Sequence, residues 1–363
     1  MKKIFLLLIV FTMQLSSCQN KKSDMKNDKF EWQEATSATI ACPIDVYMGG
    51  LISKNGFTSL YSGTTAGNWG EANRGMSSGL KTIPNHLHAI WMSYTEHTFY
   101  EIDTPIDYDK MVTLFNEGFY RPSDGDDPRP RKEEYDTIIV GFAPGGVVVI
   151  WLEGAGRQIE VGRYQGEKKT FSEEEIDALP SGPQKNMHRL DYQRKVVYEW
   201  DFIPAEVLKA NEGKPIPYGI WDMYRKKYNW QLIFESVNPM KTRKVMYTLF
   251  NGEREHLFGD TEIETYPDIP EAFRWTAKIE RAIPKTISFR WIENDTKFGG
   301  VVKFDEQEVF NVFDQVFENN PLTEAKLVIY INEDKTDATV VLKSEDKEVA
   351  LFNSKISISN HGK

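Results

Sequence analysis

The apolar positions are densest between residues 137 and 166, where they predict three strands. Two apolar runs, residues 138–142 and 147–152, are separated by an Ala-Pro-Gly-Gly turn. β-Branched runs bounded by Gly and Pro are typical of strands, and links this short make neighbouring strands antiparallel. Every position of residues 147–152 is apolar, which predicts a central strand covered on both faces. Apolar and polar residues alternate in residues 157–164, so we expect a third strand with one wet face.

A helical spacing of apolar residues follows Asp107 and, later, Asp305. Aspartate is a favoured N-cap residue, so each is expected to begin a helix. In the second helix Glu308 lies three residues after the cap, which predicts a capping box, with Phe304 and Val309 as a hydrophobic staple.

The same order of landmarks occurs twice, with corresponding residues roughly 200 positions apart. The landmarks are Trp32 and Trp230, Asn55 and Asn251, Trp91 and Trp291, and Asp107 and Asp305. We therefore predict an α+β fold of two related antiparallel β-sheet units, each with one packed helix, joined by a helical connector. The units are expected at residues 30–166 and 228–363. Residues 167–227, where Pro and Gly separate short helical stretches, are the expected connector.

The beginning of the chain has the pattern of a lipoprotein signal. Lys2 and Lys3 precede an apolar run, and Leu-Ser-Ser leads into Cys18, which resembles the bacterial lipobox. We expect residues 1–17 to be a signal peptide, Cys18 to carry the lipid, and residues 18–29 to be a flexible tether. The alternative is an ordinary signal with an incidental cysteine. Gln19 in place of an acidic residue favours the outer membrane, so the predicted location is the cell envelope, with the anchor in that membrane.

The formal net charge is −10, which argues against nucleic acid and anionic lipid as general partners and favours a basic one. The sequence has two cysteines, so with Cys18 lipidated only Cys42 remains and an internal disulfide is not expected.

Several glycine-rich and aromatic motifs carry a family resemblance. They are Gly49-Gly50-Leu51, Trp69-Gly70, Gly75-Met76-Ser77-Ser78-Gly79, the Val140-Gly141-Phe142-Ala143-Pro144-Gly145-Gly146 turn and the segment Pro217-Tyr218-Gly219-Ile220-Trp221-Asp222-Met223-Tyr224-Arg225. With them the chain resembles an uncharacterised family of bacterial lipoproteins, domain of unknown function 2931, common in Bacteroidetes. The resemblance implies a lipid-anchored envelope protein and supplies no catalytic residues. Because some members are thought to lie near contact-dependent secretion clusters, it permits an immunity-type role.

The segment 62–79 is a candidate binding loop. Its glycines allow close backbone approach, and Asn68, Trp69, Asn73 and Arg74 are able to stack on or hydrogen-bond to a ligand. The alternative is a long ordered loop that covers a sheet, with Trp69 filling a gap in the core.

A second candidate surface is the stripe formed by Trp221 and Tyr224, with Arg225 beside them. An exposed aromatic stripe binds sugars by stacking or anchors a protein partner. The alternative is that these aromatic residues belong to the core.

Other motifs are weaker. Ser77 lies in a Gly-x-Ser-x-Gly pattern, but a nucleophile elbow needs a strand before the serine and a helix after it, and neither is predicted there. His86 and His88 share a strand face without further metal ligands nearby. We therefore predict no catalytic residues, no metal site and no cofactor.

The leading hypothesis is a non-enzymatic binding protein of the envelope that sequesters a protein partner, either basic or toxin-like, as an immunity protein does. The alternative is an envelope glycan-binding protein or a serine hydrolase that uses the 62–79 loop.

Overall fold

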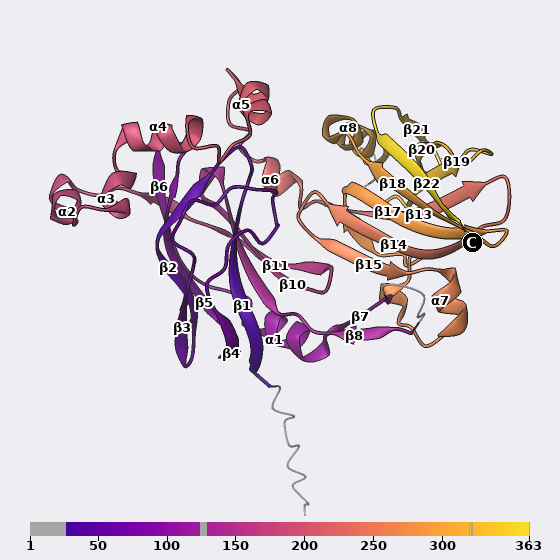
Figure 1. Ribbon diagram of the computed structural model, residues 1–363, viewed down its shortest axis with the longest axis horizontal. Helices are drawn as coiled ribbons and strands as arrows, with labels where there is room; N and C mark the ends of the chain where they lie inside the picture. Colours follow the sequence, from indigo (N-terminus) through magenta and orange to yellow (C-terminus); the bar gives the residue numbers. More distant parts are fainter. Residues whose placement is uncertain (1–26, 124–128, 319, 321, 363) are drawn as a thin grey trace, which may run out of the picture.

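The computed structural model describes residues 27–123, 129–318, 320 and 322–362 (Figure 1). The predicted signal peptide and lipidation site, Cys18, lie outside the described residues. The largest feature is a sheet that runs through both halves of the chain. In spatial order its strands are β22 (Lys355–Gly362), β18 (Thr296–Lys303), β17 (Pro284–Glu293), β14 (Lys241–Leu249), β15 (Arg254–Phe258), β11 (Arg157–Gln165), β10 (Val147–Gly154), β9 (Thr137–Ala143), β1 (Lys29–Ala38) and β4 (Ser78–Thr82).

The predicted three-stranded meander is confirmed as β9, β10 and β11, which pair antiparallel in that order. Val148, Ile150 and Leu152 contact one hydrophobic cluster, whereas Val149 and Trp151 contact another on the opposite face. Strand β10 is therefore covered on both sides, as its unbroken apolar run predicts.

In the first half, a five-stranded sheet packs against the ten-stranded sheet. Its order is β12 (Glu167–Lys169), β6 (Thr98–Pro105), β5 (His86–Ser93), β2 (Ile44–Ser53) and β3 (Gly56–Ser59). The buried layer between the two sheets includes Trp32, Trp91 and Phe142. Helix α1 (Tyr108–Glu117) adds Met111 and Phe115 to this core, so its apolar face is buried as predicted.

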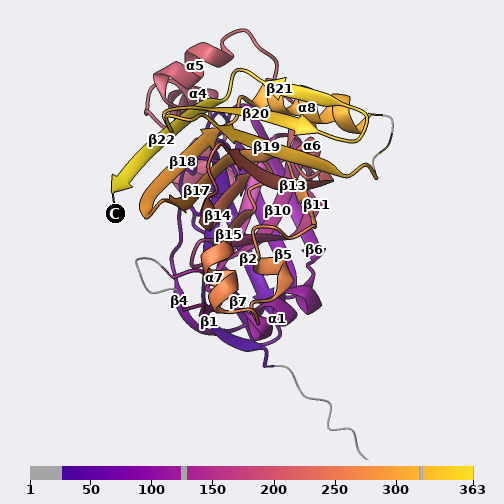
Figure 2. The same ribbon diagram turned by 90° about the vertical axis from the view of Figure 1, so that its right-hand side faces the viewer.

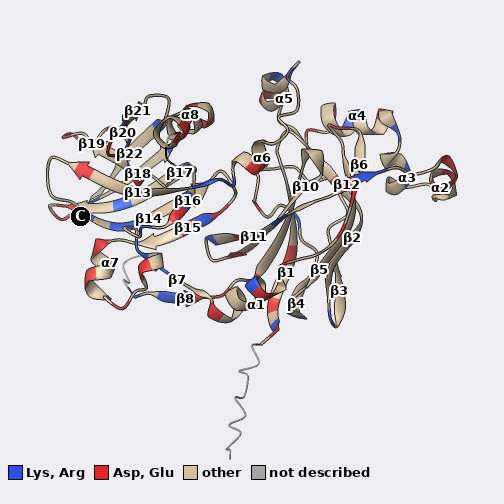
Figure 3. Cartoon of the chain, turned by 180° about the vertical axis from the view of Figure 1, so that it is seen from behind, with Lys and Arg blue, Asp and Glu red and all other residues tan. Residues whose placement is uncertain are grey.

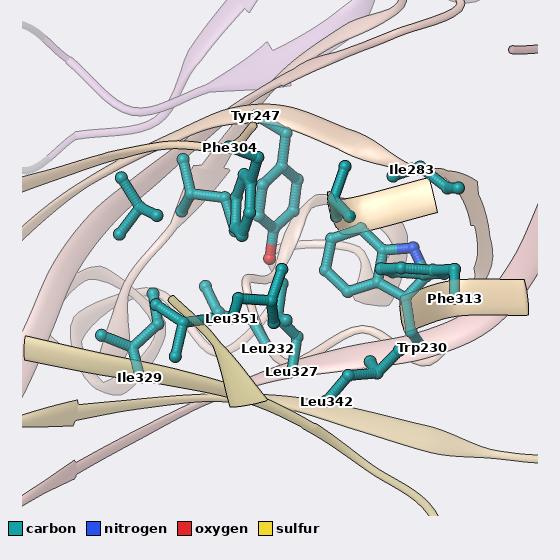
Figure 4. Packing of buried hydrophobic residues seen from close by; sticks show 14 of the residues in the cluster. Trp230, Leu232, Tyr247, Ile283, Phe304, Phe313, Leu327, Ile329, Leu342 and Leu351 are labelled. Carbon is teal, nitrogen blue, oxygen red and sulfur yellow. The ribbon is translucent and has the colours of Figure 1, made fainter. Parts of the chain in front are cut away.

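In the second half, a further five-stranded sheet covers one face of β14, β17 and β18 (Figure 2). Its order is β16 (Glu280–Ala282), β13 (Lys227–Ser236), β19 (Ala325–Ile331), β20 (Ala338–Lys343) and β21 (Glu348–Leu351). Figure 4 shows the core between them, where Trp230, Tyr247 and Phe313 come together. Phe313 belongs to helix α8 (Glu306–Phe317), whose apolar side is buried in this core.

Both predicted N-caps are present, but the capping box on α8 is not. The Asp107 carboxylate accepts a hydrogen bond from the Lys110 amide, and the Asp305 carboxylate accepts one of 2.9 Å from the Glu308 amide. The Glu308 side chain does not return to the cap. It accepts from the backbone of Phe352, which follows β21, at 2.7 Å, so it joins α8 to the C-terminal strands.

The remaining elements are short. They are β7 (Phe119–Arg121), β8 (Arg131–Glu133), α2 (Glu173–Ala178), α3 (Pro183–Met187), α4 (Leu190–Tyr198), α5 (Ala205–Asn211), α6 (Ile220–Met223) and α7 (Asp260–Thr265). Helix α4 buries Val196 and Val197 against the outer side of the first half, where Met92 and Phe99 lie.

The predicted α+β fold of two related antiparallel units joined by a helical connector is wrong. The described residues are mostly β, with 47% in strands and 20% helical, arranged in four sheets. Strands of both halves share one sheet, β1 pairs parallel with β9, and β13 pairs parallel with β19. Strand β12 of the expected connector pairs with β6. Hydrophobic periodicity identifies strands but not the partners that they find far along the chain, and this is why the prediction failed.

Candidate functional site

The 62–79 loop is fixed to the sheets at several points. Backbone bridges join Thr65 to Ile44, Gly67 to Thr39 and Arg74 to Thr36. Trp69 is half-buried and packs edge-to-face on Trp151, with 5.0 Å between ring centroids. The loop is therefore ordered and covers the end of β1, and Trp69 fills a gap in the core.

Gly70 brings this loop against the second half of the chain. A Cβ at Gly70 would lie 2.7 Å from the Cα of Gly252, so only glycine permits this approach. The Nε2 atom of Gln158 donates to the carbonyls of Gly70 and Gly252, at 2.6 and 2.7 Å. Its Oε1 atom accepts from Arg254 at 2.6 Å. Gln158 is 2% exposed, so this is a buried polar junction between the two halves.

The aromatic stripe lies beside the same junction. Trp221, in α6, is buried in the cluster that contains Trp151, with Trp69 packed against it. Tyr224 is half-buried between Phe250 and Phe310. Its hydroxyl donates to Oε1 of Glu306 at 2.5 Å. Burial, followed by the nearby Glu306 carboxylate, raises the pKa of Tyr224 well above its ordinary range, so the phenol stays protonated.

These two separately predicted segments line one cleft of about 440 Å³. In the first half and the connector, the loops 39–42 and 67–71 and the helices α5 and α6 contribute to it. In the second half, the end of β14 with the turn after it and the starts of β15, β17 and α8 contribute. The lining residues are Thr39, Ile40, Ala41, Cys42, Gly67, Asn68, Trp69, Gly70, Glu71, Asn211, Pro217, Ile220, Trp221, Tyr224, Thr248, Leu249, Phe250, Gly252, Arg254, Lys285 and Glu306. The cleft has an aromatic and aliphatic wall and a polar rim, which is the usual character of a binding site.

A larger hollow of about 680 Å³ adjoins this cleft, because both are lined by Ala41, Cys42, Asn211 and Pro217. Burial raises the pKa of the Cys42 thiol. A thiol that remains protonated is a poor nucleophile, so Cys42 contributes to the wall and not to chemistry.

Four of the seven predicted binding residues, Asn68, Trp69, Trp221 and Tyr224, line the cleft, and three do not. Asn73 donates to a carbonyl within its own loop, at Glu71. The Arg74 guanidinium lies over the ring of Tyr61. Arg225 donates two hydrogen bonds to Glu160, at 2.8 and 2.9 Å. These side chains hold the surrounding segments together.

Sequence reasoning missed the contribution of the second half. Lys285 and Thr248 lie in strands, and Glu306 is the first residue of α8. Nothing in their local sequence distinguishes them from other surface residues. Their position depends on how the halves meet, so only the tertiary structure reveals it.

The contacts of the Gly-x-Ser-x-Gly segment hold its backbone in place. The buried carboxylate of Glu34 accepts from the Met76 amide at 2.7 Å and from the Ser77 amide at 3.0 Å. The Ser77 hydroxyl donates to the same carboxylate at 2.7 Å and lies 3.0 Å from the Lys81 ammonium. Strand β4 begins directly after Ser77, whereas in a nucleophile elbow the residue is followed by a helix.

His86 and His88 face carboxylates across the neighbouring strand. His86 is hydrogen-bonded to Asp103, and His88 lies 3.7 Å from Glu101. Within the part of the chain that the structure describes, no group of three or more His, Cys, Asp or Glu side chains is placed to hold a metal ion. None of the helices in the described ranges is both long and apolar enough to span a bilayer.

No curated protein and no solved structure matches the chain. One family model matches residues 17–219, which is more than half of the chain. The match includes β1 to β12 and the cleft-lining residues from Thr39 to Pro217. The chain therefore belongs to the family described as "Protein of unknown function (DUF2931)".

Proposed function

We propose that this protein is a non-enzymatic binding protein of the cell envelope whose cleft between the two halves holds part of a protein partner. The observation that supports it is the convergence of Asn68 and Trp69 with Trp221 and Tyr224 on one cleft of about 440 Å³. These segments are far apart in the sequence, and each was a candidate for ligand binding. Anchoring through a lipid on Cys18 and an outer-membrane location belong to the same proposal, and they rest on the sequence pattern alone.

The size and chemistry of the cleft favour a side chain or a short loop of a partner. Its wall includes Ile40, Ile220 and Phe250, which suit an apolar anchor residue. Its rim carries the exposed carboxylates of Glu71 and Glu306. Arg254 and Lys285 also line the cleft, so the preference for a basic partner rests on the net charge of −10 of the whole chain.

The contacts of Ser77 bear on the hydrolase alternative. A catalytic serine needs a base that removes its proton and donors that stabilise an oxyanion. The Ser77 hydroxyl donates to Oε2 of Glu34, which also pairs with Lys81, while Oε1 of Glu34 accepts from the Met76 and Ser77 amides. These contacts support a structural role for the segment and thereby the binding hypothesis.

The test is retention of partners from envelope extracts by the immobilised full chain, compared with two variants. Ile40 lines the cleft and is 37% exposed, so Ile40→Arg places a positive charge there with little effect on the core. The matched control is Val237→Arg, because Val237 is 67% exposed and is not among the cleft residues. We expect a protein retained by the native chain to bind the cleft variant about tenfold more weakly or worse, and the control normally.

Two results would contradict the proposal. One is that no stoichiometric protein is retained by the native chain, or that a protein retained by the native chain is retained equally well by Ile40→Arg. The other is that a glycan is retained in place of a protein and is lost with Ile40→Arg, which would favour the glycan-binding alternative.

A further inference from the structure

The second half presents one sheet face that is open over β14, β17, β18 and β22, whereas on β15 His256 and Phe258 are buried on that side. In β15, β14, β17, β18 and β22, residues directly opposite each other in the pairing registers point to the same side. Val245 and Ile287 point into the core. Met246 is 42% exposed and lies opposite Ser288, so its side defines the outer face.

The outer face is basic. These strands are described throughout, and on this side they carry Lys and Arg but no Asp or Glu. The charged residues are Lys241, Lys244, Arg254, Arg290, Lys297, Lys303 and Lys355. The two glutamates of these strands, Glu255 and Glu293, point to the other side, where they pair with Arg281 and Lys335. Such a surface is unexpected on a chain with a net charge of −10.

Neighbouring carboxylates neutralise part of this face: Lys244 interacts with Glu262, and Lys297 also has a partner. Lys241 pairs with Glu264 of α7 at 2.6 Å, and Arg254 pairs with Glu153 at 2.5 Å. Figure 3 shows the acidic residues of α7 in red beside this sheet. Arg290, Lys303 and Lys355 form no ion pair or hydrogen bond with any described residue.

Like charges oppose each other directly at two places on this face. Lys244 lies opposite Arg290 in the β14–β17 pair, and Lys303 lies opposite Lys355 in the β18–β22 pair. Directly opposed like charges on neighbouring strands destabilise a sheet. Because the side chains of Lys303 and Lys355 pair with no described residue, a bound polyanion would relieve their repulsion, and this is the physical reason to expect one here.

A hollow of about 360 Å³ lies on this face beside the Lys244–Arg290 pair. It is lined by Lys244, Arg290, Ser288, Ser359 and His361, among others. Its floor is Gly299, where a Cβ would lie 2.8 Å from Nε2 of the His361 ring. The Ser359 hydroxyl is 3.0 Å from that Nε2 atom. The hollow therefore offers cationic, hydroxyl and imidazole groups around one recess, which suits an oxyanion.

We propose that this basic face binds a linear polyanionic glycan, with one sulfate, phosphate or carboxylate group in the hollow over Gly299 and a second near Lys303 and Lys355. Lys303 is four residues along β18 from Gly299, a separation of about 13 Å, which is longer than one sugar unit and suits a repeating chain. Among the described residues of the outer face no Phe, Tyr or Trp is exposed for stacking bases or anchoring a protein. Basic patches of this kind bind anionic polysaccharides.

The test is binding of the full chain, in neutral detergent, to dextran sulfate beads and to beads of uncharged dextran. We expect retention on dextran sulfate only, weakening as salt is raised. The double variant Arg290→Glu and Lys303→Glu should bind about tenfold more weakly or worse, because each reversal replaces an attraction by a repulsion. The control is Lys326→Glu, which reverses an exposed lysine on β19, in the other sheet, and should leave binding unchanged.

The proposal is overturned if the native chain is not retained, or if the double variant is retained as well as the native chain. Equal weakening by Lys326→Glu would show a response to net charge alone and would also overturn it. Tighter binding of poly-glutamate than of dextran sulfate would assign the face to an acidic protein partner instead.

Discussion

Gln158 is the residue on which the contact between the halves depends most directly. Its amide satisfies two buried carbonyls, those of Gly70 and Gly252, and accepts from Arg254. The β11–β15 pair contributes a single registered residue pair, Gln158 with Arg254, to the continuous sheet. The Gln158 side chain therefore provides hydrogen bonds between the halves that a longer ladder of paired backbone would otherwise provide.

Replacing Gln158 by Ala should lower the free energy of unfolding by about 3 kcal/mol, because two buried carbonyls lose their donor. Gln165 provides a matched control, since its Nε2 also donates to two carbonyls, at 2.7 and 2.9 Å, but the residue is exposed. Gln165→Ala should cost less than about 1 kcal/mol. Urea denaturation of the three proteins measures both values, and equal losses would contradict the assignment.

Asp45 is a buried carboxyl whose ionisation opposes folding. It is 2% exposed, and burial raises its pKa to about 6, although hydrogen bonds from Tyr94 and Thr64 act in the other direction. The folded state therefore binds a proton between pH 4 and pH 6 that the unfolded state has released. Stability is highest below this window and falls as the pH rises through it.

Asp45→Asn should remove that pH dependence and raise the stability at pH 7 by on the order of 2 kcal/mol, since the amide needs no desolvated charge. The measurement is the free energy of unfolding of both proteins from pH 4 to pH 7. A native protein that gains stability as the pH rises from 4 to 6, with no change in the variant, would show that another group dominates.

At the scale of elements, two N-caps that each accept a hydrogen bond from the amide three residues on have different surroundings. Asp305 caps α8, which buries Val309, Phe313 and other apolar residues in the second core. Ser172 caps α2 in a complete capping box with Glu175, but α2 buries no residue. Loss of a cap should matter to global stability only where the helix is part of the core.

Asp305→Ala should therefore reduce the free energy of unfolding by about 1 kcal/mol. Ser172→Ala should leave global unfolding unchanged and increase hydrogen exchange only within α2. Denaturation followed by tryptophan fluorescence, together with hydrogen-exchange mass spectrometry, separates the two effects. A global loss of similar size in both variants would mean that α2 is more tightly coupled to the core than its packing indicates.

The sequence predicted individual elements well where the apolar pattern is local. Strands β10, β19 and β20 follow unbroken or alternating apolar runs, and Asp107 and Asp305 begin the two longest helices of the described residues. The apolar pattern over residues 348–358 favours a single strand, but β21 and β22 belong to different sheets. The polar break at Asn353 and Ser354 separates them, and it is short enough to escape a periodicity argument.

At the scale of the whole molecule, the assembly of these elements was not predictable from the sequence. Trp69 and Trp221 were recognisable as candidate binding residues because a large aromatic side chain in such a segment either contacts a ligand or fills the core. That they share a cleft with Lys285 follows only from the meeting of the halves. The basic face was likewise only partly predictable. Lys244, Met246 and Thr248 alternate with core residues in the sequence, but their neighbours on the face come from other strands, which the sequence does not identify.

The two halves should unfold in separate steps. Their main hydrophobic clusters share no residue, and one contains Trp32 and Trp91 whereas the other contains Trp230 and Trp291. They are coupled by the Gln158 junction and the packing around the cleft, and also by contacts such as the hydrogen bond from the Glu160 amide to Glu253 and the Arg157 guanidinium over the Phe273 ring. We expect tryptophan fluorescence and near-ultraviolet circular dichroism in urea to show two transitions, further apart in Gln158→Ala. Coincident transitions by both probes in the native protein and in the variant would contradict this.

Strand β1 has a consequence for how the fold resists force. It begins at Lys29, pairs with β4 over its first residues and with β9 over its last, and its Glu34 side chain also holds the backbone of Met76. Tension along this strand loads both ladders in shear, so their hydrogen bonds must break together and not one after another. Any pull that reaches the protein from its N-terminal side therefore meets a mechanical clamp, whereas the same pull applied across the strand would open the ladder like a zip.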